Sequence, residues 1–160
     1  MTINLKIGDL VRGDDQVIAH QVNCQGVMNS GVAKTIRQTY PDVFEEYQRM
    51  CSCMNKNTLM GQIQIVHTPS SSRHKYVCNI FAQYSYGYDP HVRYTSYDAL
   101  DNSLRKLAEW CRNQNIKSVG FPYHMSCGYG NGDWKVVKTL IENAFNYPLN
   151  KTTINFYKLT

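Results

Sequence analysis

Two glycine-bearing segments, residues Val22–Ala33 and Phe121–Trp134, each lie between an apolar stretch that predicts a β-strand and a stretch that predicts a helix. Glycine has no Cβ atom and tolerates positive φ angles, so such a loop can turn several backbone N–H groups inward. The helix behind each loop adds the positive end of its dipole, which favours an anion. The sequence therefore predicts two anion-binding loops at strand-to-helix junctions, and two such loops suggest a nucleotide-like diphosphate ligand.

The composition is that of an ordinary globular protein. The chain has 160 residues, of which 42% are hydrophobic and 18% charged, so we expect a single domain over residues 1–160. No apolar run approaches the ~20 residues of a membrane span, and the N-terminus lacks the pattern of a signal peptide. We therefore expect a cytoplasmic monomer with no membrane segment.

The charge and the cysteines restrict the choice of partners. The formal net charge of +5 is dispersed, which favours small anionic ligands and disfavours a dedicated nucleic-acid-binding domain. The six cysteines are expected to be reduced thiols, because no secretion signal is present. Cys51 and Cys53 have no second Cys or His pair at ligand spacing, so we expect no metal and no cofactor.

Strand and helix patterns alternate along the chain. The expected strands are Ile3–Ile7, Val17–Val22, Gly61–Thr68, Tyr76–Phe81, Ile116–Phe121 and Thr153–Leu159. The expected helices are Val32–Thr39, Pro41–Arg49, Ser96–Asn113 and Trp134–Phe145. This order predicts a three-layer α/β/α fold around a mixed sheet of about six strands, with the ligand at the carboxyl ends of the strands, where both glycine loops lie.

The two commonest nucleotide-binding signatures do not fit. Gly128, Gly130 and Gly132 lack the spacing of the dinucleotide fingerprint and follow a late strand instead of the first one. The Gly-Lys-Ser/Thr of a P-loop is absent. Both folds are therefore disfavoured.

Four motifs in order resemble those of the macro domain family, which binds ADP-ribose. The motifs are Gly8–Leu10, the His20–Ala33 segment, Asn79–Tyr84 and the Phe121–Trp134 segment. The resemblance covers nearly the whole chain. It is closest to the branch that includes ADP-ribose 1''-phosphate phosphatases and de-ADP-ribosylating hydrolases.

The resemblance implies a set of ligand contacts. Asp9 would accept hydrogen bonds from the adenine amino group, with the Leu10 N–H nearby. Asn23 and the first loop would hold the distal ribose, and the second loop would wrap the diphosphate. The implied loop residues are Gly26, Val27, Met28, Asn29, Ser30, Gly31 and Val32 in the first loop, and Ser126, Cys127, Gly128, Tyr129, Gly130, Asn131 and Gly132 in the second.

Some positions depart from the pattern of the family. Asn29, Ser30, Ser126 and Asn131 stand where many relatives have glycine or another small residue. The lysine that some hydrolases of this branch carry after the Asn79 strand is missing, because Gln83 and Tyr84 occupy that segment. A lysine-dependent covalent mechanism is therefore disfavoured.

His20 and Asp133 are the candidate catalytic residues. His20 could move a proton, as the likeness to the phosphatase branch implies, or be a hydrogen-bonded core residue. Asp133 could orient or deprotonate a water, or cap the helix that follows it. For Cys127 we favour a small apolar filler over a reactive thiol.

The alternating tyrosines Tyr84, Tyr86 and Tyr88 also have two interpretations. They could stack on a base, but we favour side chains that cover the rim of the core.

These features lead to one preferred function and two alternatives. We expect metal-independent hydrolysis of ADP-ribose 1''-phosphate to ADP-ribose and phosphate. The first alternative is a mono-ADP-ribosyl hydrolase that acts on ADP-ribosylated protein or nucleic acid. The second is a non-catalytic reader that binds ADP-ribose or ADP-ribosylated macromolecules.

Overall fold

A six-stranded mixed sheet forms the centre of the structure, a computed structural model that describes residues 1–160. The strands are β1 (Thr2–Ile7), β2 (Val17–Asn23), β3 (Ile63–His67), β4 (Tyr76–Gln83), β5 (Ser118–Pro122) and β6 (Thr153–Lys158). Their order in the sheet is β1-β6-β5-β2-β4-β3. All neighbours are parallel except β3 and β4, which form an antiparallel hairpin.

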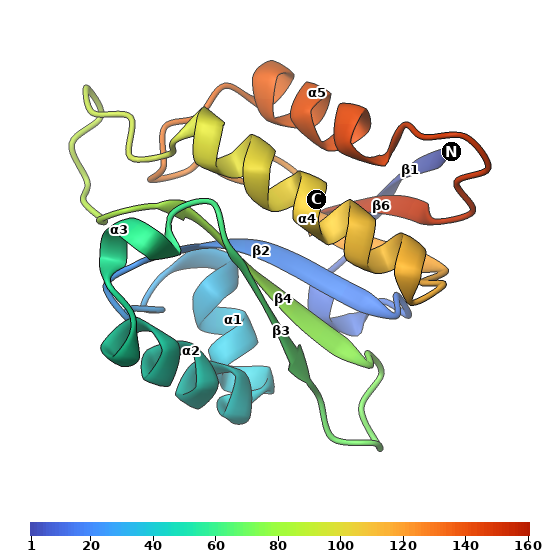
Figure 1. The fold of residues 1–160 in the computed structure, drawn as a ribbon, viewed down its shortest axis with the longest axis horizontal. Helices are drawn as coiled ribbons and strands as arrows, with labels where there is room; N and C mark the ends of the chain where they lie inside the picture. Colours follow the sequence, from blue (N-terminus) through green and yellow to red (C-terminus); the bar gives the residue numbers. More distant parts are fainter.

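Helices cover both faces of this sheet. They are η1 (Leu10–Arg12), α1 (Gly31–Thr39), α2 (Pro41–Cys53), α3 (Lys56–Leu59), α4 (Tyr97–Asn113) and α5 (Trp134–Phe145). Figure 1 shows α4 and α5 on one face and α1 and α2 on the other. This arrangement confirms the expected three-layer α/β/α fold. No helix combines the length and the apolar character that crossing a membrane requires.

The core follows from the apolar patterns of the buried elements. β2 is buried on both faces, as a central strand should be. One large cluster fills the space between the sheet and the α4–α5 layer and includes Leu104, Leu107 and Phe121. Two smaller clusters lie on the α1–α2 side and contain Ile18 and Tyr47, respectively. The central strands are therefore fixed from both sides.

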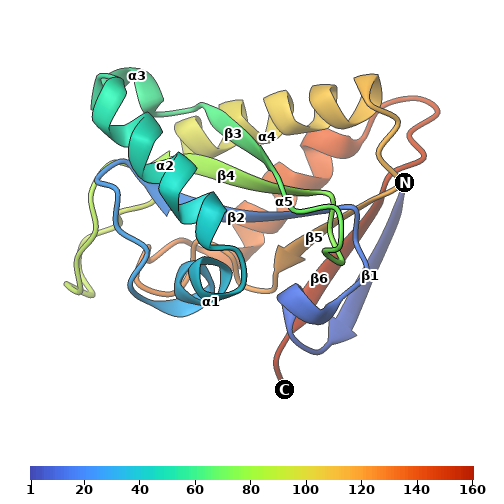
Figure 2. The same ribbon diagram turned by 90° about the horizontal axis from the view of Figure 1, so that it is seen from below.

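The topology brings the two glycine loops together. The first loop leaves β2 and enters α1, and the second leaves β5 and enters α5. Because β2 and β5 are parallel neighbours, their carboxyl ends lie at the same edge of the sheet. The segment between β4 and α4 starts from the same edge, and Figure 2 shows the three connections gathered at one end of the molecule.

Several boundaries differ from the expectation, and each difference has a local cause. α2 continues to Cys53, one turn beyond the expected end, and buries Cys51 on its inner face. The short helices η1 and α3 were not expected from apolar periodicity, which segments of three and four residues cannot display. Each is capped by a side chain, that of Asp9 or Asn55, which accepts from a backbone N–H two residues later.

Candidate ligand-binding site

A cavity of about 570 Å³ lies at the edge of the sheet where the three connections meet. This volume lies in the range of pockets that hold small molecules. Its walls come from the end of β2, the first loop, the start of α1, the segment after β4 and the second loop. No Asp, Glu, Lys or Arg side chain lines it. An anion bound there would be neutralised by backbone N–H groups and polar side chains.

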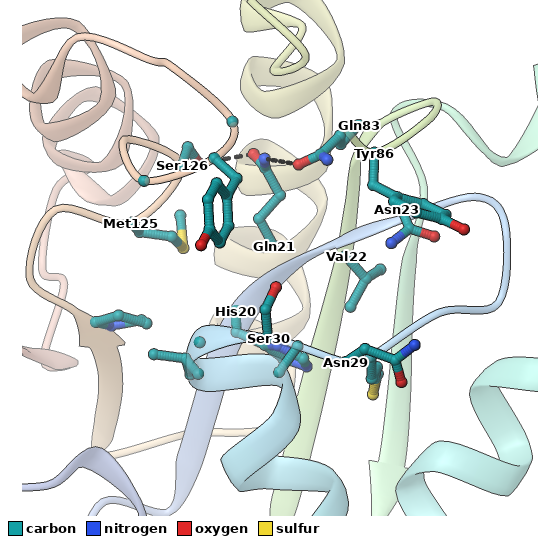
Figure 3. A pocket seen from close by; sticks show the side chains of 18 of the residues that line it. His20, Gln21, Val22, Asn23, Asn29, Ser30, Gln83, Tyr86, Met125 and Ser126 are labelled. Atoms are coloured by element: carbon teal, nitrogen blue, oxygen red, sulfur yellow. Dashed lines mark hydrogen bonds between the residues drawn. The ribbon is translucent and has the colours of Figure 1, made fainter. Parts of the chain in front are cut away.

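Most of the residues expected at the site line this cavity. They are His20, Asn23, Val27, Met28, Asn29, Ser30, Gly31, Val32, Ser126, Gly128, Tyr129 and Gly130. The structure places others outside the lining, namely Asp9, Leu10, Gly26, Cys127, Asn131, Gly132 and Asp133. Figure 3 shows Asn23 and Tyr86 on one side of the cavity and Met125 and Ser126 on the other.

The side chain of Asn23 folds the first loop. Its Nδ2 donates to the Val27 carbonyl at 2.8 Å, and its Oδ1 accepts from the Gln25 N–H at 2.9 Å. The hydroxyl of Tyr47, on α2, donates to Asn23 and accepts from the Val27 N–H at 3.1 Å. Asn23 therefore lines the cavity and also determines the shape of the loop around it.

The N-terminus of α1 points free donors at the cavity. Ser30 is the N-cap residue, but its side chain makes no capping hydrogen bond. The N–H groups of Gly31, Val32 and Ala33 have no acceptor within the protein, and all three residues line the cavity. Uncapped donors at a positive helix end form a ready-made site for an anion.

The second loop supplies another set of free donors. The N–H groups of Ser126, Gly128, Tyr129 and Gly130 donate to no acceptor within the protein, and these residues also line the cavity. His124 and Ser126 hold positive φ angles of 61° and 71°, a conformation that non-glycine residues rarely adopt.

The backbone conformation of this loop explains two of the positions that depart from the family pattern. Ser126 and Asn131 have φ angles of 71° and 57°, a region that glycine enters at little cost. Asn131 compensates by donating from Nδ2 to the carbonyls of Asp89 and Val92. The side chains of both residues therefore provide hydrogen bonds that glycine cannot.

His20 is buried beside the cavity, and 1% of its surface is exposed. Its Nε2 lies 2.6 Å from Oδ1 of Asn79, and Nδ2 of Asn79 donates to Oε1 of Gln64 at 3.0 Å. Because Asn79 presents an oxygen, this contact assigns the His20 proton to Nε2. Nδ1 is then an acceptor, and it has no partner. Burial lowers the pKa of His20 to about 4, and the hydrogen bond to Asn79 only partly opposes this, so the ring is neutral at pH 7.

Gln21 joins the end of β2 to the segment after β4 and to the second loop, a role that the sequence did not reveal. Its Nε2 donates to Oε1 of Gln83 and to Oγ1 of Thr95, both at 2.9 Å. Its Oε1 accepts from the Ser126 hydroxyl at 2.6 Å, and Figure 3 shows two of these bonds. The available signal was a polar residue directly after His20 in a mostly apolar strand, where alternation places the two side chains on opposite faces.

Asp133 and Cys127 have structural roles in this conformation. The Asp133 carboxylate accepts from the Lys135 N–H at 2.9 Å and caps α5, and the residue is exposed. Cys127 packs against the large core cluster. Burial, followed by the charge of Asp133, raises the pKa of its thiol to about 11. The filler interpretation of Cys127 agrees with this environment.

Asp9 is the N-cap of η1, and Leu10 is the first residue of that helix. The Asp9 carboxylate accepts from the Val11 N–H at 3.1 Å, and Leu10 is buried in the cluster that contains Ile18. The structure does not bring either residue to the lining of the cavity. An adenine contact at Asp9 stays a prediction.

The tyrosines after β4 do not cover the core, and that interpretation was wrong. Tyr84, Tyr86 and Tyr88 are exposed, and the last two line the cavity. The connection after β4 leaves the sheet at its carboxyl edge, so these side chains have no core surface to cover. Other lining residues that the sequence did not single out are Val22, Ala33, Gln83, Gly87, Pro122, Tyr123 and Met125.

The chain is similar both to proteins much longer than itself and to solved structures of about its own length. The chain is 30% identical over 140 residues to a DNA ADP-ribosyl glycohydrolase of Mycobacterium tuberculosis, an alignment that spans 86% of this chain and 37% of that protein. The solved macrodomain of Mycobacterium tuberculosis DarG superposes with a TM-score of 0.83 at 26% identity, covering 99% of both chains. Thermosipho africanus DarTG, solved in complex with ADP-ribose, superposes with a TM-score of 0.78 at 21% identity and covers 98% of this chain and 42% of that one.

The family assignment rests on the sequence as well as on the fold. The family model described as Macro domain matches residues 19–141, which include β2, both glycine loops and most of α5. The matched region therefore contains every wall of the cavity. This chain belongs to the macro domain family.

Proposed function

We propose that the cavity binds ADP-ribose and that the protein hydrolyses the bond that joins the distal ribose to a macromolecule, with ADP-ribosylated DNA as the first candidate substrate. The observation that carries the binding proposal is the pair of free N–H sets, at the start of α1 and in the second loop, which face one cavity. Two phosphates of a diphosphate match two sets of donors. The names of the DNA-acting relatives support the choice of DNA.

The polar side chains of the cavity suggest where the rest of the ligand lies. With the diphosphate between the two donor sets, the distal ribose would lie towards Asn23 and Gln83, at the ends of β2 and β4. Asn23 keeps one Nδ2 hydrogen for a ribose hydroxyl, because only Val27 accepts from this nitrogen. The group attached to the ribose would then leave past the exposed segment that follows β4.

His20 is the group best placed to accept a hydrogen bond during the reaction. In the proposed step a water oxygen bonds to the anomeric carbon, the bond from that carbon to the leaving group breaks, and the proton that the water loses ends on the leaving group. Nδ1 of neutral His20 has no partner but is buried in this structure, so it can orient the water or a ribose hydroxyl only after the ligand has displaced the atoms that cover it. With a pKa of about 4, His20 carries too little imidazolium at pH 7 to serve as an acid. Most of the rate enhancement would come from positioning and from the fixed N–H dipoles.

Hydrolysis of ADP-ribose 1''-phosphate is the second candidate. The observation in its favour is a histidine that lines the cavity from β2, as the likeness to the phosphatase branch implies. The position of Asp133 weighs against it, because this carboxylate caps α5 outside the cavity lining. A phosphatase step would therefore lack the water-positioning group that the sequence suggested.

One experiment compares the candidates. The purified protein is treated with EDTA and incubated separately with an ADP-ribosylated DNA oligonucleotide and with ADP-ribose 1''-phosphate, and the release of ADP-ribose and phosphate is followed. We expect release from the oligonucleotide and a loss of kcat of about 10- to 100-fold in His20→Ala. Release from the phosphate ester alone would favour the phosphatase. Binding of ADP-ribose without release from either would leave a reader, and absence of binding would end the proposal.

A further inference from the structure

The exposed aromatic side chains of this protein are confined to one place. Only four aromatic residues are exposed, all of them tyrosines: Tyr84, Tyr86, Tyr88 and Tyr129, with exposed fractions of 43%, 49%, 65% and 57%. Three follow β4 and the fourth lies in the second loop; Tyr86, Tyr88 and Tyr129 line the cavity, and Tyr84 lies just outside the lining on the same segment as the first two. We call these four residues the tyrosine rim. A cluster of exposed aromatic rings beside a pocket marks an interaction surface.

The rim is held in place by hydrogen bonds between its two segments. The N–H groups of Tyr94 and Thr95 both donate to the carbonyl of Gly130, at 3.0 and 3.1 Å. Asn131 closes the other end through the carbonyls of Asp89 and Val92. The rings of Tyr88 and Tyr129 also meet edge to face, with centroids 4.7 Å apart. The tyrosines therefore sit on two loops that are joined to each other.

The surroundings of the rim favour a polyanionic partner with flat rings. Tyrosine rings stack on nucleobases, and each stacked base typically adds enough affinity to be detected by alanine substitution. Arg37 lies at the first loop, where it donates to Oδ1 of Asn29, and Arg93 stacks on Tyr97 beside the second loop. Asp89 is the one acidic residue between Tyr84 and Ser96, and the cavity lining contains none.

We propose that the tyrosine rim is a stacking surface for the bases of a single-stranded nucleic acid whose ADP-ribosyl group occupies the cavity. The placement of an ADP-ribosyl group in the cavity rests on the proposed function, because it puts the polymer where the group attached to the distal ribose would emerge. Base stacking by the tyrosine rim can be tested without any ADP-ribose.

The test measures binding of a fluorescent, unmodified single-stranded DNA oligonucleotide by polarisation. Wild-type protein is compared with the double variants Tyr88→Ala/Tyr129→Ala and Tyr88→Phe/Tyr129→Phe, and with Tyr84→Ala, which lies outside the cavity lining. We expect the alanine pair to weaken binding by about tenfold or more, and the phenylalanine pair, which keeps the rings, to stay within about twofold of wild type. Because Arg37 and Arg93 lie beside the rim and can contact phosphates, we expect binding also to weaken as the salt concentration rises.

Several results would overturn the inference. It fails if wild-type protein does not bind the oligonucleotide, or if the alanine pair binds it as tightly as wild type. It also fails if the alanine pair and Tyr84→Ala weaken binding of an ADP-ribosylated peptide but leave binding of the DNA oligonucleotide unchanged. Circular dichroism checks that the variants fold. Calorimetric titration of wild-type protein with ADP-ribose tests the proposed function separately, since its failure would leave the oligonucleotide result unchanged.

Discussion

At the scale of single residues, the burial of His20 links the site to the stability of the fold. The ring lies in an apolar strand, and one of its two nitrogens is satisfied by Asn79. The sequence could identify His20 as a candidate, since it ends an apolar run. It could not show the asymmetry between the two nitrogens, because that depends on Asn79 in the neighbouring strand, whose Cα pairs with that of His20.

The depressed pKa of His20 makes the stability of the protein depend on pH. Between its folded value of about 4 and its ordinary value of 6.5, the unfolded chain binds a proton that the folded protein does not. Lowering the pH through this window therefore favours unfolding, by about 3 kcal/mol at pH 4 relative to pH 7. Urea unfolding at several pH values should show wild type losing this much more stability than His20→Gln. His74, whose pKa burial also lowers, is present in both proteins, so its contribution cancels. If the free energy of unfolding depends on pH in the same way in both proteins, the low pKa assigned to His20 is wrong.

At the scale of elements, the strands and long helices were predictable and the loop conformations were not. The bounds of α5 agree with the expectation, and α4 differs from it only in beginning one residue after Ser96, whose side chain caps the helix, because both signals are local. The conformation of the second loop does not follow from local sequence signals. Its positive φ angles fall on His124, Ser126 and Asn131, whereas Gly130 and Gly132 serve close approaches of the backbone instead. Such contacts join segments far apart in the sequence, which spacing alone does not reveal.

Two glycines of the second loop should therefore respond differently to alanine. A Cβ at Gly130 would lie 2.5 Å from Oγ1 of Thr95 and 2.7 Å from the Ser126 carbonyl, whereas a Cβ at Gly128 would meet nothing within 4 Å. Thr95 cannot move freely, because Gln21 donates to the same oxygen. We expect Gly130→Ala to cost about 1–3 kcal/mol and to lower Tm by several degrees. Gly128→Ala is the matched control and should change Tm little. Calorimetric melting curves measure both, and equal Tm values would refute the packing argument.

At the scale of the whole molecule, a buried polar cluster joins the segment before β2 to the C-terminal strand β6. Asp15, of which 2% is exposed, accepts from Nδ2 of Asn155 at 2.6 Å and from the Tyr157 hydroxyl at 2.5 Å. The sequence could not show that the carboxylate of Asp15 turns inward, because both of its partners lie more than a hundred residues away.

Removing one donor from this cluster should weaken the fold. Tyr157→Phe leaves Oδ2 of Asp15 buried without its hydrogen bond, at a cost of about 1–3 kcal/mol in the free energy of unfolding. Tyr76→Phe is a suitable control, since the Tyr76 ring packs on Trp110 and its hydroxyl makes no hydrogen bond within the protein. Chemical denaturation of the two variants should separate them clearly. A loss of the same size in both would show that the ring environment matters more than the Asp15 contact.

The pairing of β1 with β6 has a consequence for how the chain acquires its structure. β6 lies between β1 and β5, and Asn4 meets Asn155 across 151 positions of sequence. During synthesis on the ribosome, β1 emerges long before β6, so the two strands cannot pair until almost all of the chain between them has been synthesised. The β5-β2-β4-β3 part of the sheet can assemble earlier, so we expect insertion of β6 to be a late and slow step, as contacts distant in sequence generally are.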